Sequence, residues 1–234
     1  MLKQDFWAKY FKEYDNLNYL YPYDDLLELI CDIAEIKTSD RVLDIGSGTG
    51  NLSEKISKRG AAVTAIDFSV DGNMIHSKKN DKTIIILHDI KFPLPFENAV
   101  FDVLVSNNTL YAITRKDRDS VFKEMYRVLK PGGRIVISNI NDKFTPSKIY
   151  FDHVKKSIKH NGLLKTLKDV IILMMPTIKI LYYNHLVKKE NEFGVYDFFK
   201  DGEQRNMLLS AGFKNVSEDI ITYSNQAILN HGIK

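Results

Sequence analysis

Residues 42–50 read VLDIGSGTG, and this stretch decides the fold. Its first four residues are typical of a buried strand, and Gly46, Gly48 and Gly50 follow at alternate positions. Glycine lets the backbone bend sharply and lets a ligand approach closely. Residues 51–59 then show a helical pattern, so the stretch predicts a strand-to-helix turn that binds a nucleotide.

Short β-branched runs alternate with helical stretches from residue 41 onward, which is typical of a parallel sheet covered by helices. The expected strands span 41–46, 62–67, 83–89, 101–107, 134–140, 213–223 and 226–231. Only Ser224 and Asn225 separate the last two strands, so we expect an antiparallel hairpin at the sheet edge. A helix over 116–130 is expected to end at the Pro-Gly-Gly of residues 131–133. The prediction is an α/β, Rossmann-like fold with a seven-stranded, mostly parallel sheet and helices on both faces.

Two helical segments are expected outside this core, within a single domain of residues 1–234. Residues 1–37 are rich in aromatic side chains and form a predicted N-terminal cap. Residues 141–200, which we name the lid, lie between the fifth and sixth strands and are too long for a plain connection. The lid contains a long series of apolar residues flanked by lysines, and this pattern has two interpretations. It forms helices packed on the domain or on a second copy of the chain, or it forms an apolar acceptor pocket whose lysines face water, an anionic substrate or a membrane surface.

Composition favours an ordinary globular enzyme. The 234 residues are 44% hydrophobic, and the net charge of +3 is spread among acidic and basic residues, which is a weak nucleic-acid signal. The only cysteine, Cys31, lies in an apolar helical pattern and reads as a buried thiol. No signal-peptide pattern or apolar run of membrane-spanning length occurs, so we expect a cytoplasmic protein.

Acidic residues follow three consecutive predicted strands. Asp67 ends the second strand, where an α/β nucleotide site holds the ribose hydroxyls. Asp89 follows the third strand and would face the same crevice, where it could accept from an exocyclic amine. Asp44 ends the first strand. Each charged hydrogen bond contributes about 1.5 to 3 kcal/mol, so these carboxylates predict a tight nucleotide site.

Taken together, these residues resemble the class I S-adenosylmethionine-dependent methyltransferases, in the small-molecule group called type 11 or quinone-biosynthesis-like. The resemblance covers about residues 41–140. It is carried by the glycine turn, the two acidic positions, the fourth strand and a very close helix-and-turn signature, at residues 42–50, 67, 89–90, 101–108 and 122–133.

The resemblance implies S-adenosylmethionine as the cofactor and no metal. Residues implied to hold the cofactor are Asp44, Gly46, Ser47, Gly48, Gly50, Asp67, Phe68, Asp89, Ile90, Asn107 and Asn108. In this arrangement Gly46 and Gly48 pass under the methionine part, and Asp44 lies near its ammonium group. Asp67 takes the ribose and Asp89 the adenine amine.

Phe68 and Ile90 are implied to flank the adenine, with Asn107 and Asn108 beside the sulfonium. The chain departs from the family pattern at two places. The link over residues 69–73 is longer than usual, and residues 109–112 lack the histidine that many relatives place after the fourth strand.

Methyl transfer needs mainly alignment of donor and acceptor, so few residues are catalytic candidates. Tyr14 and Tyr111 are candidates to orient the acceptor, although such aromatic rings more often serve packing. His153, in the lid, is a candidate general base near neutral pH, although a lone helical histidine is more often a surface or packed residue.

The predicted reaction is methyl transfer to oxygen or nitrogen, rather than carbon, of a small, partly apolar metabolite. An RNA or protein methyltransferase is the first alternative, but residues 106–109 lack the Asn-Pro-Pro-aromatic motif of base-methylating enzymes, and no basic stripe is present. A nicotinamide dehydrogenase is disfavoured because Asn51 replaces the third glycine of its turn. A non-catalytic S-adenosylmethionine-binding subunit is the remaining alternative.

Overall fold

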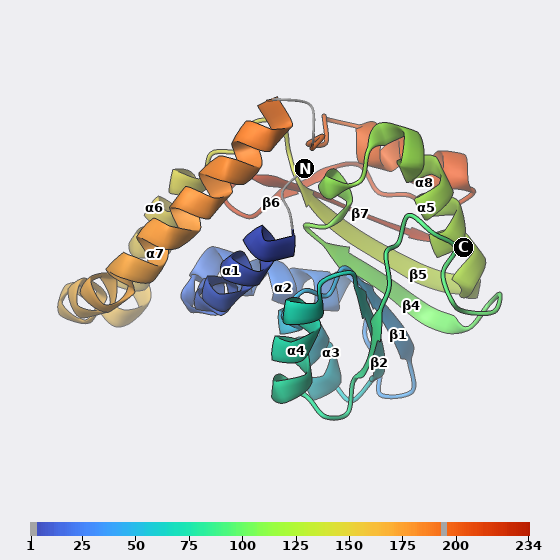
Figure 1. Ribbon diagram of the computed structural model, residues 1–234, viewed down its shortest axis with the longest axis horizontal. Coiled ribbons are helices and arrows are strands. Elements are labelled where there is room, and N and C mark those ends of the chain that lie inside the picture. The colour runs from blue at the N-terminus through green and yellow to red at the C-terminus, as the bar shows by residue number, and fades with distance from the viewer. Residues whose placement is uncertain (1–3, 193–195) are drawn as a thin grey trace.

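A seven-stranded sheet forms the centre of the protein (Figure 1). The computed structural model describes residues 4–192 and 196–234. In the order β3-β2-β1-β4-β5-β7-β6, the strands are β3 Ile84–Leu87, β2 Ala62–Asp67, β1 Arg41–Ile45, β4 Phe101–Asn107, β5 Leu129–Ile140, β7 Ala227–Ile233 and β6 Ile220–Thr222. Strands from β3 to β5 pair in parallel, whereas β7 pairs antiparallel with both β5 and β6. The predicted Rossmann-like sheet with a terminal hairpin is confirmed.

The strand order reverses at β1, which pairs with β2 on one side and with β4 on the other. Val42, Leu43 and Ile45 of β1 are completely buried, so this strand is fixed in the core. Open α/β sheets bind ligands in the crevice outside the carboxyl ends of the strands at such a point. The topology therefore places a candidate site beside the ends of β1 and β4.

Helices cover both faces of the sheet, as predicted (Figure 1). On one face lie α2 Tyr21–Ile33, α3 Asn51–Lys58 and α4 Val70–Lys79; on the other lie α5 Arg115–Val128 and α8 Glu203–Ala211. Cys31 of α2 is completely buried, and burial raises the pKa of its thiol to about 12. This cysteine is therefore a packing residue with no thiolate at neutral pH.

Helical segments before β1 and after β5 meet over one end of the sheet. The first comprises α1 Gln4–Tyr14, the 3-10 helix η1 Asp15–Tyr19, and α2. The second comprises α6 Pro146–Asn161 and α7 Leu163–Glu192, which lie side by side and contact α2 and α1 (Figure 1). Helices are thus present in the described parts of both the predicted cap and the predicted lid; residues 1–3 and 193–195 lie outside the described residues.

Several boundaries differ from the predictions by one or two residues, and two strands differ by more. The expected helix over 116–130 ends at Val128, so the Pro-Gly-Gly of residues 131–133 lies within β5 and does not end the helix. β5 begins at Leu129, not at 134, because Leu129 already pairs with Phe101 and the register shifts before Val103. The expected sixth strand over 213–223 is only Ile220–Thr222 long. Asn215 has a left-handed φ of 49°, which interrupts the extended backbone and leaves an isolated bridge upstream.

Within the described ranges, none of the individual helices has the length and hydropathy to cross a membrane. The two limbs of α7, Leu163–Ile171 and Met174–Lys189, meet at a bend of 64° and reach the threshold only when taken together.

Candidate functional site

The glycine turn after β1 is shaped by left-handed backbone and close packing. Gly46, Gly48 and Gly50 have φ values of 73°, 54° and 82°. A Cβ built on Gly46 would lie 2.2 Å from the side chain of Thr109, in the segment after β4. The turn therefore favours glycine at position 46, because the backbone there is left-handed and Thr109 leaves no room for a side chain. It also holds the ends of β1 and β4 together.

We expect Gly46→Ala to lower the free energy of unfolding by about 2 to 3 kcal/mol, because the methyl group adds a clash to a left-handed strain. Gly132→Ala is the matched control, since Gly132 has a φ of 77° and nothing within 4 Å of the added Cβ. We expect the control to cost about 1 kcal/mol in urea unfolding. Equal losses in the two variants would show that packing against Thr109 contributes nothing.

A cavity opens beside this turn and is lined by ten of the predicted site residues. They are Tyr14, Asp44, Gly46, Ser47, Gly48, Asp67, Phe68, Asn107, Asn108 and Tyr111. Residues from β1, β2 and β4 form the floor, and residues of α1, α2 and α7 form the walls. The structure thus brings together, at the strand-order reversal, most of the residues that the sequence singled out.

Asp67 orders the glycine turn from the end of β2. Its two carboxylate oxygens accept backbone N–H groups of Gly48 and Ser69, each at 2.8 Å. Burial raises the pKa of Asp67, and these backbone donors act in the opposite direction. Each oxygen can accept a further hydrogen bond, so the carboxylate is fixed in orientation and able to receive hydroxyl groups from the cavity.

Asp44 is the second buried acid of the cavity. Its carboxylate is 1% exposed and accepts the Ser53 hydroxyl at 2.6 Å. Burial raises the pKa of Asp44 to about 7; the Ser53 bond opposes this rise, and the charge of Asp67 adds to it. Among the described residues that line the cavity, no lysine, arginine or histidine balances the two acids. The site is therefore complementary to a cationic ligand.

Several buried polar atoms at the cavity lack a hydrogen-bond partner within the described parts of the chain. They are Ser47 Oγ, Asn51 Nδ2, Asn107 Oδ1 and Asn108 Oδ1. Buried polar groups in native proteins are normally satisfied, because each unsatisfied group costs about 1 to 3 kcal/mol. Their gathering around one cavity indicates that a polar ligand completes their bonding.

Aromatic side chains from the N-terminal helices close the cavity. Tyr10 donates its hydroxyl to Asn184 Oδ1 at 2.8 Å, which joins α1 to α7. Phe11 packs on the glycine turn, since a Cβ on Gly48 would lie 3.3 Å from its ring. The sequence indicated only an aromatic cap; Tyr10, Phe11, Asn184 and Tyr223 are cavity residues that it did not single out.

Burial raises the pKa of Tyr14 and raises that of Tyr111 well above the ordinary value. Both side chains therefore carry neutral hydroxyls at physiological pH. Tyr111 lies in the 3-10 helix η2 Leu110–Ala112 and packs edge-on against Phe198, with 5.4 Å between ring centroids. The two tyrosines can orient a ligand, but they do not supply a base.

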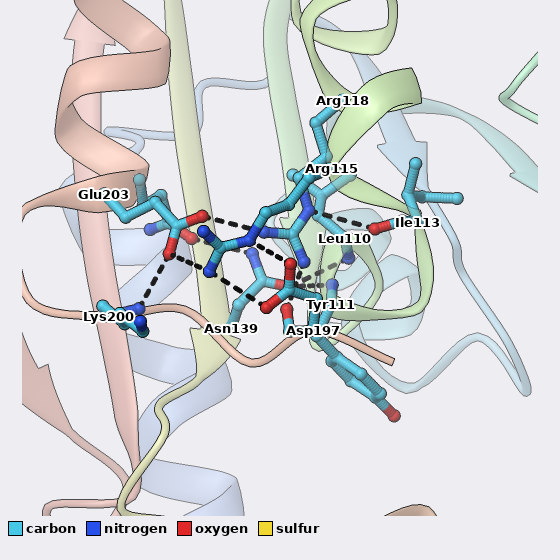
Figure 2. Close-up of polar contacts among 10 residues, drawn as sticks. Leu110, Tyr111, Ile113, Arg115, Arg118, Asn139, Asp197, Lys200 and Glu203 are labelled. Atoms are coloured by element: carbon cyan, nitrogen blue, oxygen red, sulfur yellow. Dashed lines mark hydrogen bonds and ion pairs between the residues drawn. The ribbon is translucent and has the colours of Figure 1, made fainter. Parts of the chain in front are cut away.

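A polar network holds the turn that carries Tyr111 (Figure 2). The Asn139 side-chain oxygen accepts the backbone N–H groups of Leu110 and Tyr111 at 2.8 and 3.3 Å. The backbone carbonyl of Tyr111 accepts the N–H of Asp197 at 3.0 Å. Arg118 extends the network, since its guanidinium bonds to the carbonyls of Ile113 and Asp197. The end of the lid, around Asp197, thereby fixes the position of a cavity residue.

The structure places four predicted site residues outside the cavity lining. Gly50 packs on His76, since a Cβ there would lie 2.1 Å from that ring. Asp89 pairs with the Lys91 ammonium at 3.1 Å, beyond the end of β3, and the neighbouring Ile90 lines a separate hollow.

His153 is the fourth of these residues. Its Nδ1 accepts the Tyr21 N–H at 3.2 Å, in a hollow between α2 and α6, and burial lowers its pKa. Because His153 is turned toward α2, the geometry does not bring the predicted general base to the cavity. α6, which carries His153, nevertheless packs against α2 and α7, and both of these helices contribute residues to the cavity lining.

Comparison with known proteins identifies the family. Residues 43–137 match the family described as "Methyltransferase domain". Over 196 residues the chain is 31% identical to the ubiquinone/menaquinone biosynthesis C-methyltransferase UbiE of Geotalea daltonii, covering 78% of this chain and 74% of that relative. This chain belongs to the S-adenosylmethionine-dependent methyltransferases. The resemblance inferred from the sequence motifs is confirmed.

A second relative and a solved structure are also similar to this methyltransferase. It is 29% identical over 189 residues to the carboxy-S-adenosyl-L-methionine synthase of Staphylococcus epidermidis, covering 77% of this chain and 74% of that relative. A solved structure of a putative S-adenosyl-L-methionine-dependent methyltransferase from Methanococcus maripaludis matches with a TM-score of 0.63 and 22% identity, covering 100% of this chain and 96% of the other. That structural match supports the fold.

The cavity residues of the methyltransferase fit its sulfonium cofactor. The two buried acids have no described cation beside them, and unpartnered polar atoms point to a polar ligand. S-adenosylmethionine carries an ammonium, a sulfonium and a ribose diol, which match both features. The names of the relatives differ in the reaction, so they do not identify the acceptor.

Proposed function

We propose that this methyltransferase transfers the methyl group of S-adenosylmethionine to oxygen or nitrogen of a small, partly apolar acceptor. The pair of buried carboxylates, Asp44 and Asp67, on either side of the glycine turn carries this proposal. Asp44 would hold the ammonium group, and Asp67 would receive the ribose hydroxyls. The sulfonium makes the methyl group electrophilic when the donor is bound, so the chain needs only to align the acceptor.

The remaining cofactor contacts follow from the order of elements around the cavity. Gly46 and Gly48 would lie under the methionine part, and Asn107 and Asn108 would line the side of the sulfonium. Phe68 would flank the adenine. Leu87 pairs in register with Asp67, so the segment after β3 follows beside the ribose, and adenine would extend toward Asp89 and Ile90.

The acceptor wall of the cavity is apolar and aromatic. It includes Leu17, Ile140, Phe144, Val187 and Tyr223. The described lining provides no histidine, lysine or cysteine as a base, and burial keeps its tyrosines protonated. With the carboxylates of Asp44 and Asp67 assigned to the cofactor, the acceptor has to supply an atom that is nucleophilic without a further protein base.

A carbon acceptor is the second candidate, because the Geotalea daltonii relative is named a C-methyltransferase. Purified protein with tritium-labelled S-adenosylmethionine would be incubated with small-molecule, RNA and protein fractions of a cell extract. We expect label in the small-molecule fraction, and mass spectrometry of the product would assign the atom. Label confined to RNA or protein would overturn the proposal.

Asp67→Ala is expected to weaken the binding of S-adenosylhomocysteine about ten- to hundredfold, because up to two charged hydrogen bonds to the ribose are lost. Isothermal titration calorimetry measures this change. Asp119→Ala, at an exposed acid of α5, is the control and should leave the affinity unchanged. If Asp67→Ala binds S-adenosylhomocysteine with unaltered affinity, the Asp67 carboxylate does not bind the ribose.

A further inference from the structure

α7 presents an apolar stripe to solvent. Figure 1 shows α6 and α7 side by side, extending away from the sheet. Along α7 the exposed large apolar side chains recur every three or four residues, which is one face of a helix. They are Leu163, Leu164, Leu167, Ile171, Met174, Met175, Ile178 and Tyr182. Leu164 and Ile171 are 85% and 70% exposed, so this face is not packed against the protein.

The opposite side of α7 faces inward and is mixed in polarity, with Ile180 and Val187 buried in the core. Thr166 is buried and hydrogen-bonds to the Ser157 hydroxyl of α6 at 3.0 Å. Asn184 accepts the Tyr10 hydroxyl, and Asn184 and Val187 line the cavity. A helix on a water-soluble surface normally presents a polar face outward. α7 is apolar on its exposed side as well as over part of its inward side, which indicates an apolar partner for the exposed stripe.

Charge is segregated onto the same hairpin. Residues 146–192, which span α6 and α7, hold nine lysines, two aspartates and two glutamates, a net charge of +5, whereas the whole chain has +3, which leaves −2 for the rest. Lys156 pairs with Asp25, and Lys179 pairs with Glu13.

Three other lysines of the hairpin, Lys155, Lys159 and Lys168, are exposed and make no ion pair with any described residue. α6 also exposes Phe151 and Ile158 near these lysines. Spacings of three or four residues place Phe151, Ile158 and the two lysines of α6 on one face of that helix. We name this face of α6, together with the exposed stripe of α7, the docking face.

We propose that the docking face, formed by the exposed apolar residues of α6 and α7 and their flanking lysines, binds the surface of an anionic lipid bilayer. Apolar side chains would enter the acyl boundary while lysines contact acidic headgroups. Each limb of α7 is by itself too short to cross a bilayer, and the two limbs meet at a bend of 64°. Both features fit a helix that lies along the membrane surface. The net charge of +5 on the hairpin selects an anionic surface over a neutral one.

The docking face is the back of a cavity wall, because Asn184 and Val187 project from the other side of the same helix. A bilayer held there would bring apolar molecules dissolved in it next to the proposed acceptor wall. The binding itself rests on the exposed stripe and the charge alone, so it can be tested without the methyl-transfer reaction.

Flotation of the full chain with lipid vesicles tests the proposal. We expect binding to phosphatidylcholine vesicles that contain about 30% phosphatidylglycerol, weaker binding without the anionic lipid, and weakening as salt rises. Lys155→Gln, Lys159→Gln and Lys168→Gln combined should lower the partition coefficient about a hundredfold, since each lysine near the surface contributes about fivefold. Leu164→Glu with Ile171→Glu should abolish binding to both vesicle types.

Matched controls are Lys37→Gln, Lys78→Gln and Lys82→Gln combined, and Ile84→Glu with Phe92→Glu, all at exposed positions away from the hairpin. Thermal unfolding checks that each variant is folded. Full binding in the controls supports the docking face. No binding of the wild-type chain to anionic vesicles overturns it. An equal loss of vesicle binding in the controls and the test variants also overturns it. The same holds if the chain dimerises without lipid and Leu164→Glu with Ile171→Glu removes that dimer.

Discussion

Asp44→Asn is expected to stabilise the ligand-free protein by about 2 kcal/mol at about pH 8 and to weaken S-adenosylhomocysteine binding about a hundredfold. Burial raises the pKa of Asp44 to about 7 from 3.8, so the folded chain binds this proton more tightly than the unfolded chain. The resulting destabilisation is absent below about pH 4, grows as the pH rises toward 7, and is complete above 7. An asparagine keeps the Ser53 bond and carries no charge, although its buried amide offsets part of the gain.

Urea unfolding of both proteins at several pH values measures this effect. The gain in the variant should fall away as the pH is lowered from 7 toward 4, because the wild-type carboxyl then becomes neutral. A gain independent of pH would assign the effect to packing instead of charge. Calorimetry on the wild type should show affinity rising with pH up to about 7, since an ionised Asp44 attracts the ligand ammonium.

Sequence patterns predicted the floor of this site because local chemistry determines it. Gly46 and Gly48 adopt left-handed backbone that glycine tolerates, and Asp44 and Asp67 end adjacent parallel strands. Strand ends meet at one edge of a sheet, so spacing along the chain translates directly into neighbours in space. The same rule extends less well to Asp89, because β3 ends at Leu87 and a further turn intervenes.

The walls could not be predicted in this way, because long-range packing sets them. Tyr10 meets Asn184 across 174 positions of sequence, a contact that depends on how α1 and α7 cross. The same limit applies to His153, because its position on a helix did not reveal that its side chain turns toward Tyr21 and away from the cavity. Docking angles of helices arise from the fit of whole surfaces, which periodicity does not encode.

The network around Arg118 is the clearest feature that sequence spacing did not disclose. Its guanidinium is completely buried, 4.1 Å from the centroid of the Phe199 ring. It bonds to two backbone carbonyls and to Glu203 Oε1, the last at 3.2 Å (Figure 2). A charge buried in this way needs every partner in place, so the network specifies one arrangement of α5, α8 and the end of the lid.

Arg118→Met is therefore expected to lower the free energy of unfolding by about 4 kcal/mol, because it leaves two carbonyls and Glu203 Oε1 without their cationic donor. Arg115→Met is the matched control on the same helix. Arg115 also bonds to Asp197 and Glu203, but its side chain is 50% exposed, so its removal should cost about 1 kcal/mol or less.

Urea unfolding of the two variants separates burial from ion pairing, since both lose a salt bridge to Glu203. Arg118→Met should also weaken binding of S-adenosylhomocysteine in conditions where the variant is folded, because Asp197 holds the carbonyl of Tyr111 at 3.0 Å. Arg115→Met should leave that affinity unchanged. If the two variants lost equal stability, the buried position of Arg118 would not be what makes the network essential, and its link to the cavity would fail with it.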